Sequence, residues 1–350
     1  MHSFVPEFLE AQPVSQELVG IVRAIGEHKG RQELFRNQVP QVLERMRAQA
    51  LIRSTESSNR IEGISAPTRV VERIVRGRLE PKNRSEREIA GYRDVLDHIH
   101  TAWADMPFTT GLVLQLHRDL LRYVPSEGGV WKNADNTITE TLVDGTERVR
   151  FVPVPAFQTP EAMAALHERF ARVWDAGRID RLLLIPAYLL DFLCIHPFRD
   201  GNGRMARLLC LLLLYKAGYE VGRYISLEEI VERTKEGYYR SLHAASQGWH
   251  DGAHALAPVW DYFLGVMLET AYRQFEERVG DLQARRGAKR EMILAAIDNL
   301  PETFRYRDIT DACPGVSRPT ISRVLAELHH RGAIRLAARG RAALWEKVSD

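Results

Sequence analysis

The chain has little cysteine and almost no net charge, and each scarcity excludes a class of protein. Its three cysteines, Cys194, Cys210 and Cys313, form no close pair in the sequence. We therefore expect buried, reduced thiols rather than a disulfide framework or a metal cluster, as is typical of the reducing cytoplasm. The formal net charge is only +2, which gives no chain-wide case for binding nucleic acid or a membrane surface.

The chain also lacks a long uninterrupted apolar run. Its most apolar stretches, 182–195 and 208–215, are shorter than the about 20 apolar residues that cross a bilayer. The first residues contain no basic region followed by an apolar one, so we expect no signal peptide. With 350 residues, 45% of them hydrophobic, the sequence predicts a cytoplasmic protein of two or three domains with no membrane partner.

The polar segment between those two stretches, residues 196–207, reads His-Pro-Phe-Arg-Asp-Gly-Asn-Gly-Arg-Met-Ala-Arg. The simplest interpretation is an apolar helix that ends, a polar loop, and a second apolar helix that begins. The loop then lies at a helix N-terminus, where free N–H groups and the helix dipole favour an anion. Gly201 and Gly203 allow the backbone to approach that anion closely.

The side chains of this segment provide the other groups that a polyphosphate site needs. His196 titrates near neutrality and can serve as a base or an acid. Asp200 is available for a hard cation such as Mg²⁺, and the Asn202 amide can donate to an anion. Arg204 and Arg207 are three positions apart on the first helical turn, and their forked guanidinium groups suit phosphate oxygens.

The same segment resembles the signature of the Fic/Doc family, His-Pro-Phe-x-(Asp/Glu)-Gly-Asn-Gly-Arg-x-x-Arg, at every fixed position. The resemblance implies a mainly α-helical Fic fold and a protein adenylyltransferase, which moves AMP from ATP to a Ser, Thr or Tyr hydroxyl of a target protein or of itself. It makes His196 the catalytic base and Asp200 the Mg²⁺ ligand. The implied phosphate- or nucleotide-binding residues are Phe198, Gly201, Asn202, Gly203, Arg204, Arg207 and Tyr239, although the Phe198 ring is expected to point into the core.

A second segment, Ser58-x-x-x-Glu62-Gly63, precedes the catalytic one. Ser58 and Glu62 share one face if the segment is helical, and from the residues alone we favour an ordinary polar turn and short helix. The segment also resembles the inhibitory (Ser/Thr)-x-x-x-Glu-(Gly/Asn) motif of Fic proteins. That resemblance implies that the N-terminal helical region, 1–105, carries an inhibitory helix, with Glu62 reaching Arg207 and filling the space of the γ-phosphate.

Two runs rich in β-branched residues flank Asp144-Gly145 within residues 136–152, which predicts a β-hairpin. By itself it is either a surface decoration or an edge offered to an extended peptide. Fic proteins have a hairpin flap at this place. The resemblance therefore implies a flap along which the target protein binds, in a catalytic core at 106–285.

Residues 288–350 form a separate C-terminal unit after a charged linker at 283–287. Expected helices at 290–300, 306–312 and 317–330, followed by strands at 333–336 and 342–346, resemble a winged helix-turn-helix with its third helix in the recognition position. Val316–Arg341 contains six arginines and one glutamate, the local basicity expected of a DNA-binding unit. Such units also bind proteins or form homodimers, so the partner stays open.

Apolar residues at helical spacing predict that most of the remaining chain is α-helical. We expect helices at 15–25, 32–52, 68–80, 85–104, 109–123, 160–175 and 256–285, and a helix pair at 226–247. Ser85 and Glu88 have the spacing of a capping box, and Pro40 is expected to break a helix or begin one. His117 is interpreted as a surface or packing residue rather than a ligand.

Alternatives remain open within the same fold and outside it. The site could remove AMP, with Glu62 positioning a water, or transfer another nucleotide, because Ser246 stands where some relatives have the asparagine that accompanies Tyr239 in the base pocket. From a different class, the chain could be a DNA-binding transcriptional regulator that acts through its C-terminal winged helix.

Overall fold

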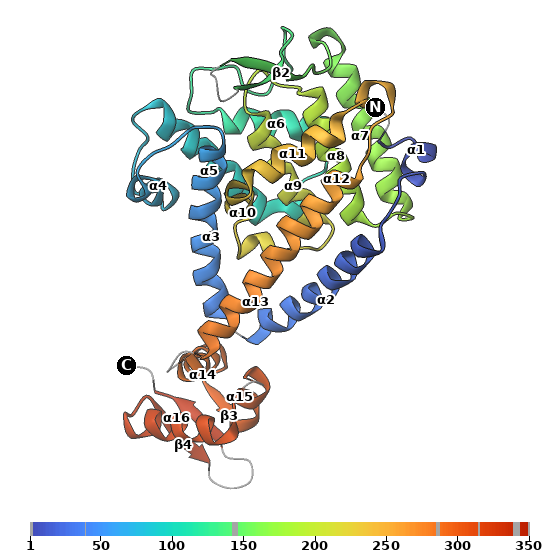
Figure 1. Ribbon diagram of the computed structural model, residues 1–350. Coiled ribbons are helices and arrows are strands. Elements are labelled where there is room, and N and C mark those ends of the chain that lie inside the picture. Colours follow the sequence, from blue (N-terminus) through green and yellow to red (C-terminus); the bar gives the residue numbers. More distant parts are fainter. Residues whose placement is uncertain are drawn as a thin grey trace. The chain divides into compact units, whose positions relative to one another are not determined.

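The computed structural model describes residues 3–38, 40–141, 146–284, 288–313, 316–338 and 344–348. These residues are mainly helical, as the sequence predicts, with strands in one hairpin and one three-stranded sheet (Figure 1). The chain forms two units, one of Met1–Glu27 with Ala48–Tyr272 and one of His28–Arg47 with Arg273–Asp350. Within the described part of the chain, no helix is long and apolar enough to cross a membrane.

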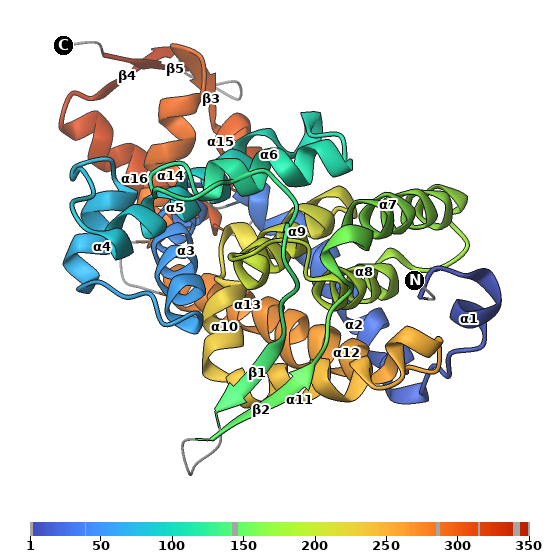
Figure 2. The same ribbon diagram turned by 90° about the horizontal axis from the view of Figure 1, so that it is seen from above.

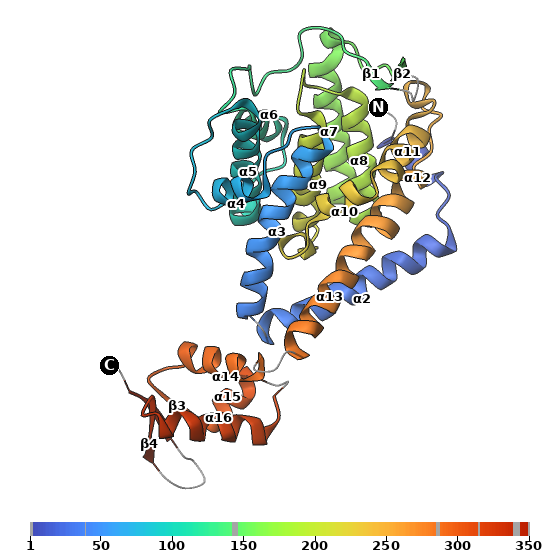
Figure 3. The same ribbon diagram turned by 60° about the vertical axis from the view of Figure 1, so that its left-hand side comes forward.

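Two central helices, α8 (Arg181–Ile195) and α9 (Asn202–Lys216), form the core of the first unit. Nearly all of their side chains are buried, because a helix that is apolar on every side requires neighbours all round. α7 (Thr159–Ala176) packs on α8, and α5 (Arg84–Ala102) packs on α9. Figure 3 shows α8 and α9 between α5 on one side and α12 (Ala257–Trp260) on the other.

The other helices of the first unit surround this pair. They are α1 (Pro6–Glu10), α4 (Thr68–Val75), α6 (Thr110–Leu120), α10 (Leu227–Arg233) and α11 (Lys235–Ser246), with single 3₁₀ turns at Trp103–Asp105, Ala156–Gln158, Val221–Arg223 and Trp249–Asp251. Three further helices have residues in both units: α2 (Gln16–Gln38), α3 (Pro40–Ile61) and α13 (Glu269–Ala284). The expected boundary near residue 105 is not observed, because α5 packs on both α6 and α9.

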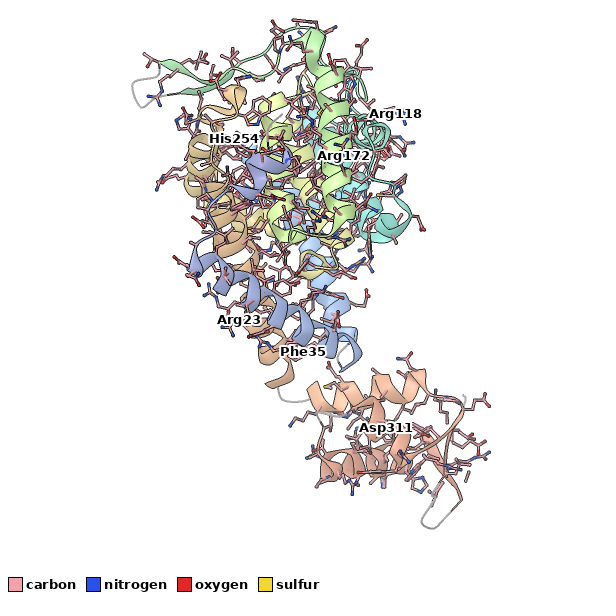
Figure 4. All side chains as sticks on the ribbon, turned by 90° about the vertical axis from the view of Figure 1, so that its right-hand side faces the viewer. Arg23, Phe35, Arg118, Arg172, His254 and Asp311 are labelled. Carbon is pink, nitrogen blue, oxygen red and sulfur yellow. The ribbon has the colours of Figure 1, made fainter. Side chains whose placement is uncertain are left out.

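The N-terminal segment is fastened to α8 by a buried polar cluster. The Ser3 hydroxyl donates to Asp191 Oδ1 at 2.6 Å and lies 2.8 Å from His254 Nε2. The Phe8 ring stacks on the His254 ring with centroids 4.3 Å apart, and Figure 4 shows His254 close to α1. The Trp249 indole also donates to Asp191 Oδ1, at 2.6 Å, so the buried carboxylate has two donors on one oxygen. These contacts help to fix α8.

The hairpin is formed by β1 (Ile138–Thr141) and β2 (Glu147–Phe151). The strands are antiparallel and pair Thr139 with Val149 and Thr141 with Glu147. β2 packs on α11, and Figure 2 shows the hairpin running alongside that helix. The two strands confirm the predicted hairpin; its Asp144-Gly145 turn lies outside the described residues.

The second unit contains α14 (Ala288–Asn299), β3 (Thr303–Arg305), α15 (Tyr306–Ala312), α16 (Arg318–His330), β4 (Ile334–Ala338) and β5 (Leu344–Lys347). The sheet is antiparallel in the order β3-β5-β4. Its core includes Ile293, Phe304, Ile309, Ile321 and Leu325. The sequence predicts all three helices and the last two strands but misses β3, which is too short to show an alternating pattern. Residues 285–287 of the expected linker lie outside the described ranges.

Three local predictions can be compared directly with the structure. Pro40 begins α3, which is one of the two roles expected for it, to break a helix or to begin one. The predicted Ser85–Glu88 capping box is wrong, because Asn83 caps α5 by accepting the N–H of Glu86 at 2.9 Å. The long helix expected at 256–285 is interrupted by a π-helical segment, Asp261–Leu268, between α12 and α13.

Candidate active site

His196 follows α8 directly, and its backbone is left-handed. It caps the helix with φ 51° and ψ 61°, the one positive φ at a non-glycine residue in the described ranges. Its Nδ1 lies 3.3 Å from the carbonyl oxygen of Leu193. Because a carbonyl only accepts, Nδ1 carries the proton in this contact, and the lone pair is left on Nε2.

The surroundings of His196 keep its imidazole neutral. Burial lowers the pKa of His196 to about 4, and the Lys132 ammonium adds to this effect while Glu62 and Asp200 oppose it. A histidine with a pKa near 4 is almost entirely unprotonated at neutral pH, which is the form that accepts a proton. The side chain remains half-buried rather than closed off from the cleft.

The catalytic loop, residues 196–201, is held by its own side chains as well as by glycine. Gly201 adopts φ 81° immediately before α9. Asn202 accepts the N–H of Phe198 at 2.9 Å and donates to the Phe198 carbonyl at 2.8 Å. Both ends of the Asn202 amide thus help to close the loop, and donation of this amide to an anion stays a prediction.

The Phe198 ring is fully buried, so it has no surface to offer a nucleotide. It stacks on the His117 ring with centroids 3.6 Å apart and planes 10° from parallel. The ring therefore packs in the core, as expected from the sequence. A nucleotide-binding role for Phe198 is therefore indirect, through the shape of the catalytic loop.

Arg204 is placed away from the position that the sequence predicts. Its side chain is 1% exposed, and Nη1 donates to Glu88 Oε2 at 2.8 Å. Nη2 lies 3.6 Å from Asp200 Oδ2. A guanidinium already paired with a buried carboxylate is not a free phosphate ligand, so the expectation that Arg204 holds phosphate oxygens is corrected.

Asp200 has an exposed carboxylate, with 60% of its side-chain surface accessible. The N–H of Gly201 donates to its Oδ1 at 2.6 Å, and the residue lines a different cavity from the one that His196 lines. No group of three metal-ligating side chains occurs among the described residues. Mg²⁺ commonly takes one or two carboxylates and completes its shell with phosphates and water, so Asp200 fits the role of a single protein ligand.

Arg207 is a phosphate-binding candidate that lines the same cleft as His196. Its Nη2 donates to Glu62 Oε1 at 2.8 Å and to the Ser58 carbonyl at 2.9 Å, and its Nε donates to the Ser58 hydroxyl at 2.8 Å. Burial alone would lower the pKa of the Arg207 guanidinium, but the Glu62 carboxylate raises it above its ordinary value. Arg207 is thus charged and engaged by α3.

Glu62 occupies the N-terminal end of α9. It follows α3 directly, and Gly63 turns the chain away with φ 78°. A Cβ atom built on Gly203 would collide with the Glu62 carboxylate. The carboxylate therefore lies where the free N–H groups and the dipole of α9 favour an anion, and the absence of a side chain at Gly203 makes room for it.

His196, Arg207, Glu62 and Gly203 line one open cleft. Arg150, from β2, donates to the Tyr239 carbonyl at 2.7 Å and lies 5.7 Å from the centre of the Tyr239 ring. Tyr239 is on α11, so this contact ties the hairpin to the wall of the cleft. Ser246 lines the same cleft, but its hydroxyl donates to the His243 carbonyl at 3.0 Å, which occupies the hydroxyl proton.

The sequence does not reveal three residues that contact the catalytic loop. His117 is 2% exposed, so the packing alternative is correct and the surface one is wrong. Burial lowers the pKa of His117 to about 4. From the segment that precedes β1, Lys132 donates to the carbonyls of Ile195 and Pro197, and Asn136 donates to the Phe198 carbonyl. They are more than 60 positions from the loop, and no local spacing connects such distant residues.

Comparison with known proteins finds relatives of part of the chain. The Fic/DOC family matches residues 107–214. Protein adenylyltransferase Fic of Drosophila erecta is 27% identical over 214 residues, which are 59% of this chain and 39% of that protein. The same-named protein of Drosophila grimshawi is 30% identical over 166 residues, 46% of this chain and 30% of that protein. The match thus spans less than half the length of these relatives.

Solved structures show the same fold. A Fic family protein from Desulfovibrio desulfuricans superposes with a TM-score of 0.64 at 22% identity, covering 97% of this chain and 98% of that one. A Fic domain containing signaling protein from Bacteroides thetaiotaomicron gives 0.61 at 20% identity, covering 73% and 98%. Residues 107–214 thus match the Fic/DOC family, and the two solved structures share the fold of the chain.

Proposed function

We propose that the chain is an autoinhibited protein adenylyltransferase, which transfers AMP from ATP to a hydroxyl group of a target protein and of itself. The observation that carries the proposal is the shared cleft, in which a neutral His196 faces Arg207 and the N-terminus of α9. A general base, a guanidinium and a helix N-terminus in one cleft are the groups that phosphoryl transfer requires. The names of the curated relatives support AMP transfer.

In this mechanism the phosphates of ATP lie at the N-terminus of α9, with Arg207 on the outer phosphates. The target hydroxyl oxygen attacks the α-phosphorus, the bond from that phosphorus to the bridging oxygen of the β-phosphate breaks, and pyrophosphate leaves. The hydroxyl proton passes to Nε2 of His196. Mg²⁺ held at Asp200 would supply positive charge to the phosphates. The hairpin, tied to α11 through Arg150, presents its edge to the target backbone.

Autoinhibition follows from the position of Glu62. With the Arg207–Glu62 pair formed at 2.8 Å, the γ-phosphate lacks its guanidinium partner and meets a carboxylate at the end of α9. ATP then binds with its α-phosphate out of line with the attacking hydroxyl. Ser58 stabilises this arrangement, since it accepts from Arg207 through both its hydroxyl and its carbonyl.

The reaction is tested by incubating the full chain with Mg²⁺ and each nucleoside triphosphate separately, and by measuring the mass added to the protein. An AMP adduct with ATP, and none with the others, supports adenylylation. A UMP, GMP or CMP adduct replaces it with another nucleotidyl transfer on the same site. Loss of AMP from a previously modified chain, dependent on Glu62, identifies the reverse activity. No adduct from any nucleotide, with a Glu62 variant included, contradicts the proposal.

The pH dependence of transfer provides a separate prediction. Since the pKa of His196 is about 4 in the free protein, the base stays neutral as the pH falls from 8 to 5. We expect kcat/KM for the target to stay level over that range and to decline as the pH approaches 4. The measurement is a pH–rate profile at a fixed Mg²⁺ concentration, with a buffer series as control. A decline centred near 6.5, the ordinary histidine pKa, would show that burial does not shift this base.

DNA binding is a second candidate function, carried by the exposed face of α16. Arg318 and Arg323 are exposed on this helix, whereas Ile321 and Leu325 are buried. In contrast, Arg331 is 3.0 Å from Glu327. Arg335 likewise pairs with Glu346, at 2.7 Å. The last two basic residues of the expected patch, Arg339 and Arg341, lie outside the described residues.

We expect Arg318→Glu with Arg323→Glu to weaken binding of the full chain to duplex DNA. Removing side chains that bind phosphates should also flatten the dependence of log Kd on log salt, by about one unit for each phosphate no longer neutralised. Fluorescence anisotropy at several stated salt concentrations measures both effects, with Arg307→Glu on α15 as the matched control. Equal affinities for the two variants and the parent chain would exclude this face as a DNA-binding surface.

A further inference from the structure

The carbonyl groups of the catalytic loop are held from outside the loop. The carbonyls of Pro197, Phe198 and Asp200, and that of Ile195 directly before the loop, each accept a hydrogen bond from residues 117–136. Buried carbonyls require hydrogen-bond donors. Because these donors all come from one distant segment, they also fix the orientation of each peptide group. We call the three residues that supply these bonds, His117, Lys132 and Asn136, the positioning layer.

Lys132 contacts the carbonyls on both sides of His196. Its ammonium donates to the Ile195 carbonyl at 3.1 Å, and its backbone N–H donates to the Pro197 carbonyl at 2.8 Å. The same ammonium donates to Asn136 Oδ1 at 2.8 Å. Lys132 is only 5% exposed, so few conformations are open to its side chain.

His196 requires such support because its backbone is left-handed at φ 51°. This conformation is uncommon for a residue with a side chain and persists only when the surroundings impose it. The Lys132 ammonium also meets a carbonyl at the C-terminus of α8, the end of a helix that favours a cation. One side chain therefore stabilises both the end of α8 and the conformation of His196.

His117 holds the other end of the catalytic loop. Its Nδ1 accepts the N–H of Gly129 at 3.0 Å, so Nε2 carries the proton and donates to the Asp200 carbonyl at 3.0 Å. Because an N–H group can only donate, these contacts fix the tautomer. The chain can pass close to α6 at Gly129 because this residue has no side chain; a Cβ atom there would collide with Arg118. His117 thus joins α6, the segment before β1 and the loop.

We propose that the positioning layer sets the placement of His196 relative to the N-terminus of α9, with Lys132 as the main positioning residue. The proposal rests on the function proposed above, in which the Nε2 atom and the phosphates meet within the cleft. None of the three side chains is required to touch the nucleotide. Their loss therefore affects the rate of the chemical step rather than the binding of ATP.

The test of Lys132 compares two substitutions in a Glu62→Gly parent. Lys132→Met keeps the length of the side chain and the backbone N–H but removes the ammonium, whereas Lys132→Arg keeps a cationic donor. A misplaced catalytic group typically costs about 10²-fold in rate. We expect Lys132→Met to lower kcat by roughly 10- to 100-fold with KM for ATP within about twofold, and Lys132→Arg to recover most of kcat. An unchanged kcat, or a loss confined to KM, would overturn the proposal.

Hydrogen–deuterium exchange of the full chain provides a readout that does not depend on transfer. Peptides covering the catalytic loop should exchange faster in Lys132→Met than in Lys132→Arg, while peptides from the second unit stay unchanged. Equal exchange in both variants would contradict the positioning role even if the chain transfers no nucleotide. Failure of the proposed function, seen as no labelling in the Glu62→Gly parent, is thus distinguishable from failure of this inference.

His117 allows a second matched pair. Glutamine places its amide N–H near the position of Nε2 and can donate to the Asp200 carbonyl. Asparagine reaches only the position of Nδ1 and leaves that carbonyl without a donor. Both variants lose the stacking on Phe198, so their comparison isolates the bond to the loop. We expect His117→Gln to retain at least about fivefold more kcat than His117→Asn at similar melting temperatures, since a lost hydrogen bond costs about 1 kcal/mol; equal kcat values would overturn the role of this bond.

Discussion

Replacing Glu62 with glycine is expected to increase transfer of AMP to the protein itself by roughly 10- to 100-fold. The substitution removes the carboxylate that accepts from Arg207 at 2.8 Å and clears the N-terminus of α9. Hydrogen bonds to charged groups contribute about 1.5–3 kcal/mol, and each 1.4 kcal/mol corresponds to about tenfold. The released guanidinium then meets the γ-phosphate. The measurement is the initial rate of labelling with α-labelled ATP and Mg²⁺.

Two further variants identify the cause of such an increase. Glu62→Gln keeps the size of the side chain but removes its charge, so it should activate less than Glu62→Gly. Glu56→Gln, on α3, is the matched control, because Glu56 pairs with Arg60 at 2.8 Å and is not part of the cleft. It should label at the wild-type rate. Equal rates for wild type and Glu62→Gly would refute autoinhibition by this residue.

The sequence predicts the central parts of the site because those parts are local. The helix–loop–helix around residues 196–207 follows from two apolar stretches separated by polar and glycine residues, and the structure has the loop between α8 and α9. The pairing of Glu62 with Arg207 is different. It joins residues 145 positions apart, and periodicity alone favours an ordinary turn there. Only the resemblance to a family motif indicates that contact in advance.

The incorrect predictions share a physical cause, which is that a residue type does not specify its partner. Arg204 and Arg207 are both arginines on the first turns of α9, but Glu88 lies beside the first and Glu62 beside the second. The spacing of Glu88 from Ser85 favours a capping box, because the sequence does not show that α5 packs on α9 at this point.

Replacing His196 with alanine in the Glu62→Gly chain should reduce transfer by about 10²–10⁴-fold, the usual contribution of a general base. ATP affinity should be nearly unchanged, because Arg207 and the N-terminus of α9 supply the phosphate contacts. The matched control is His98→Ala on α5, an exposed histidine that does not line the cleft. Labelling measures the rate, and calorimetry with ATP measures the affinity. If His196→Ala kept its rate, Nε2 would not be the proton acceptor; if it lost ATP affinity equally, His196 would act in binding rather than in proton transfer.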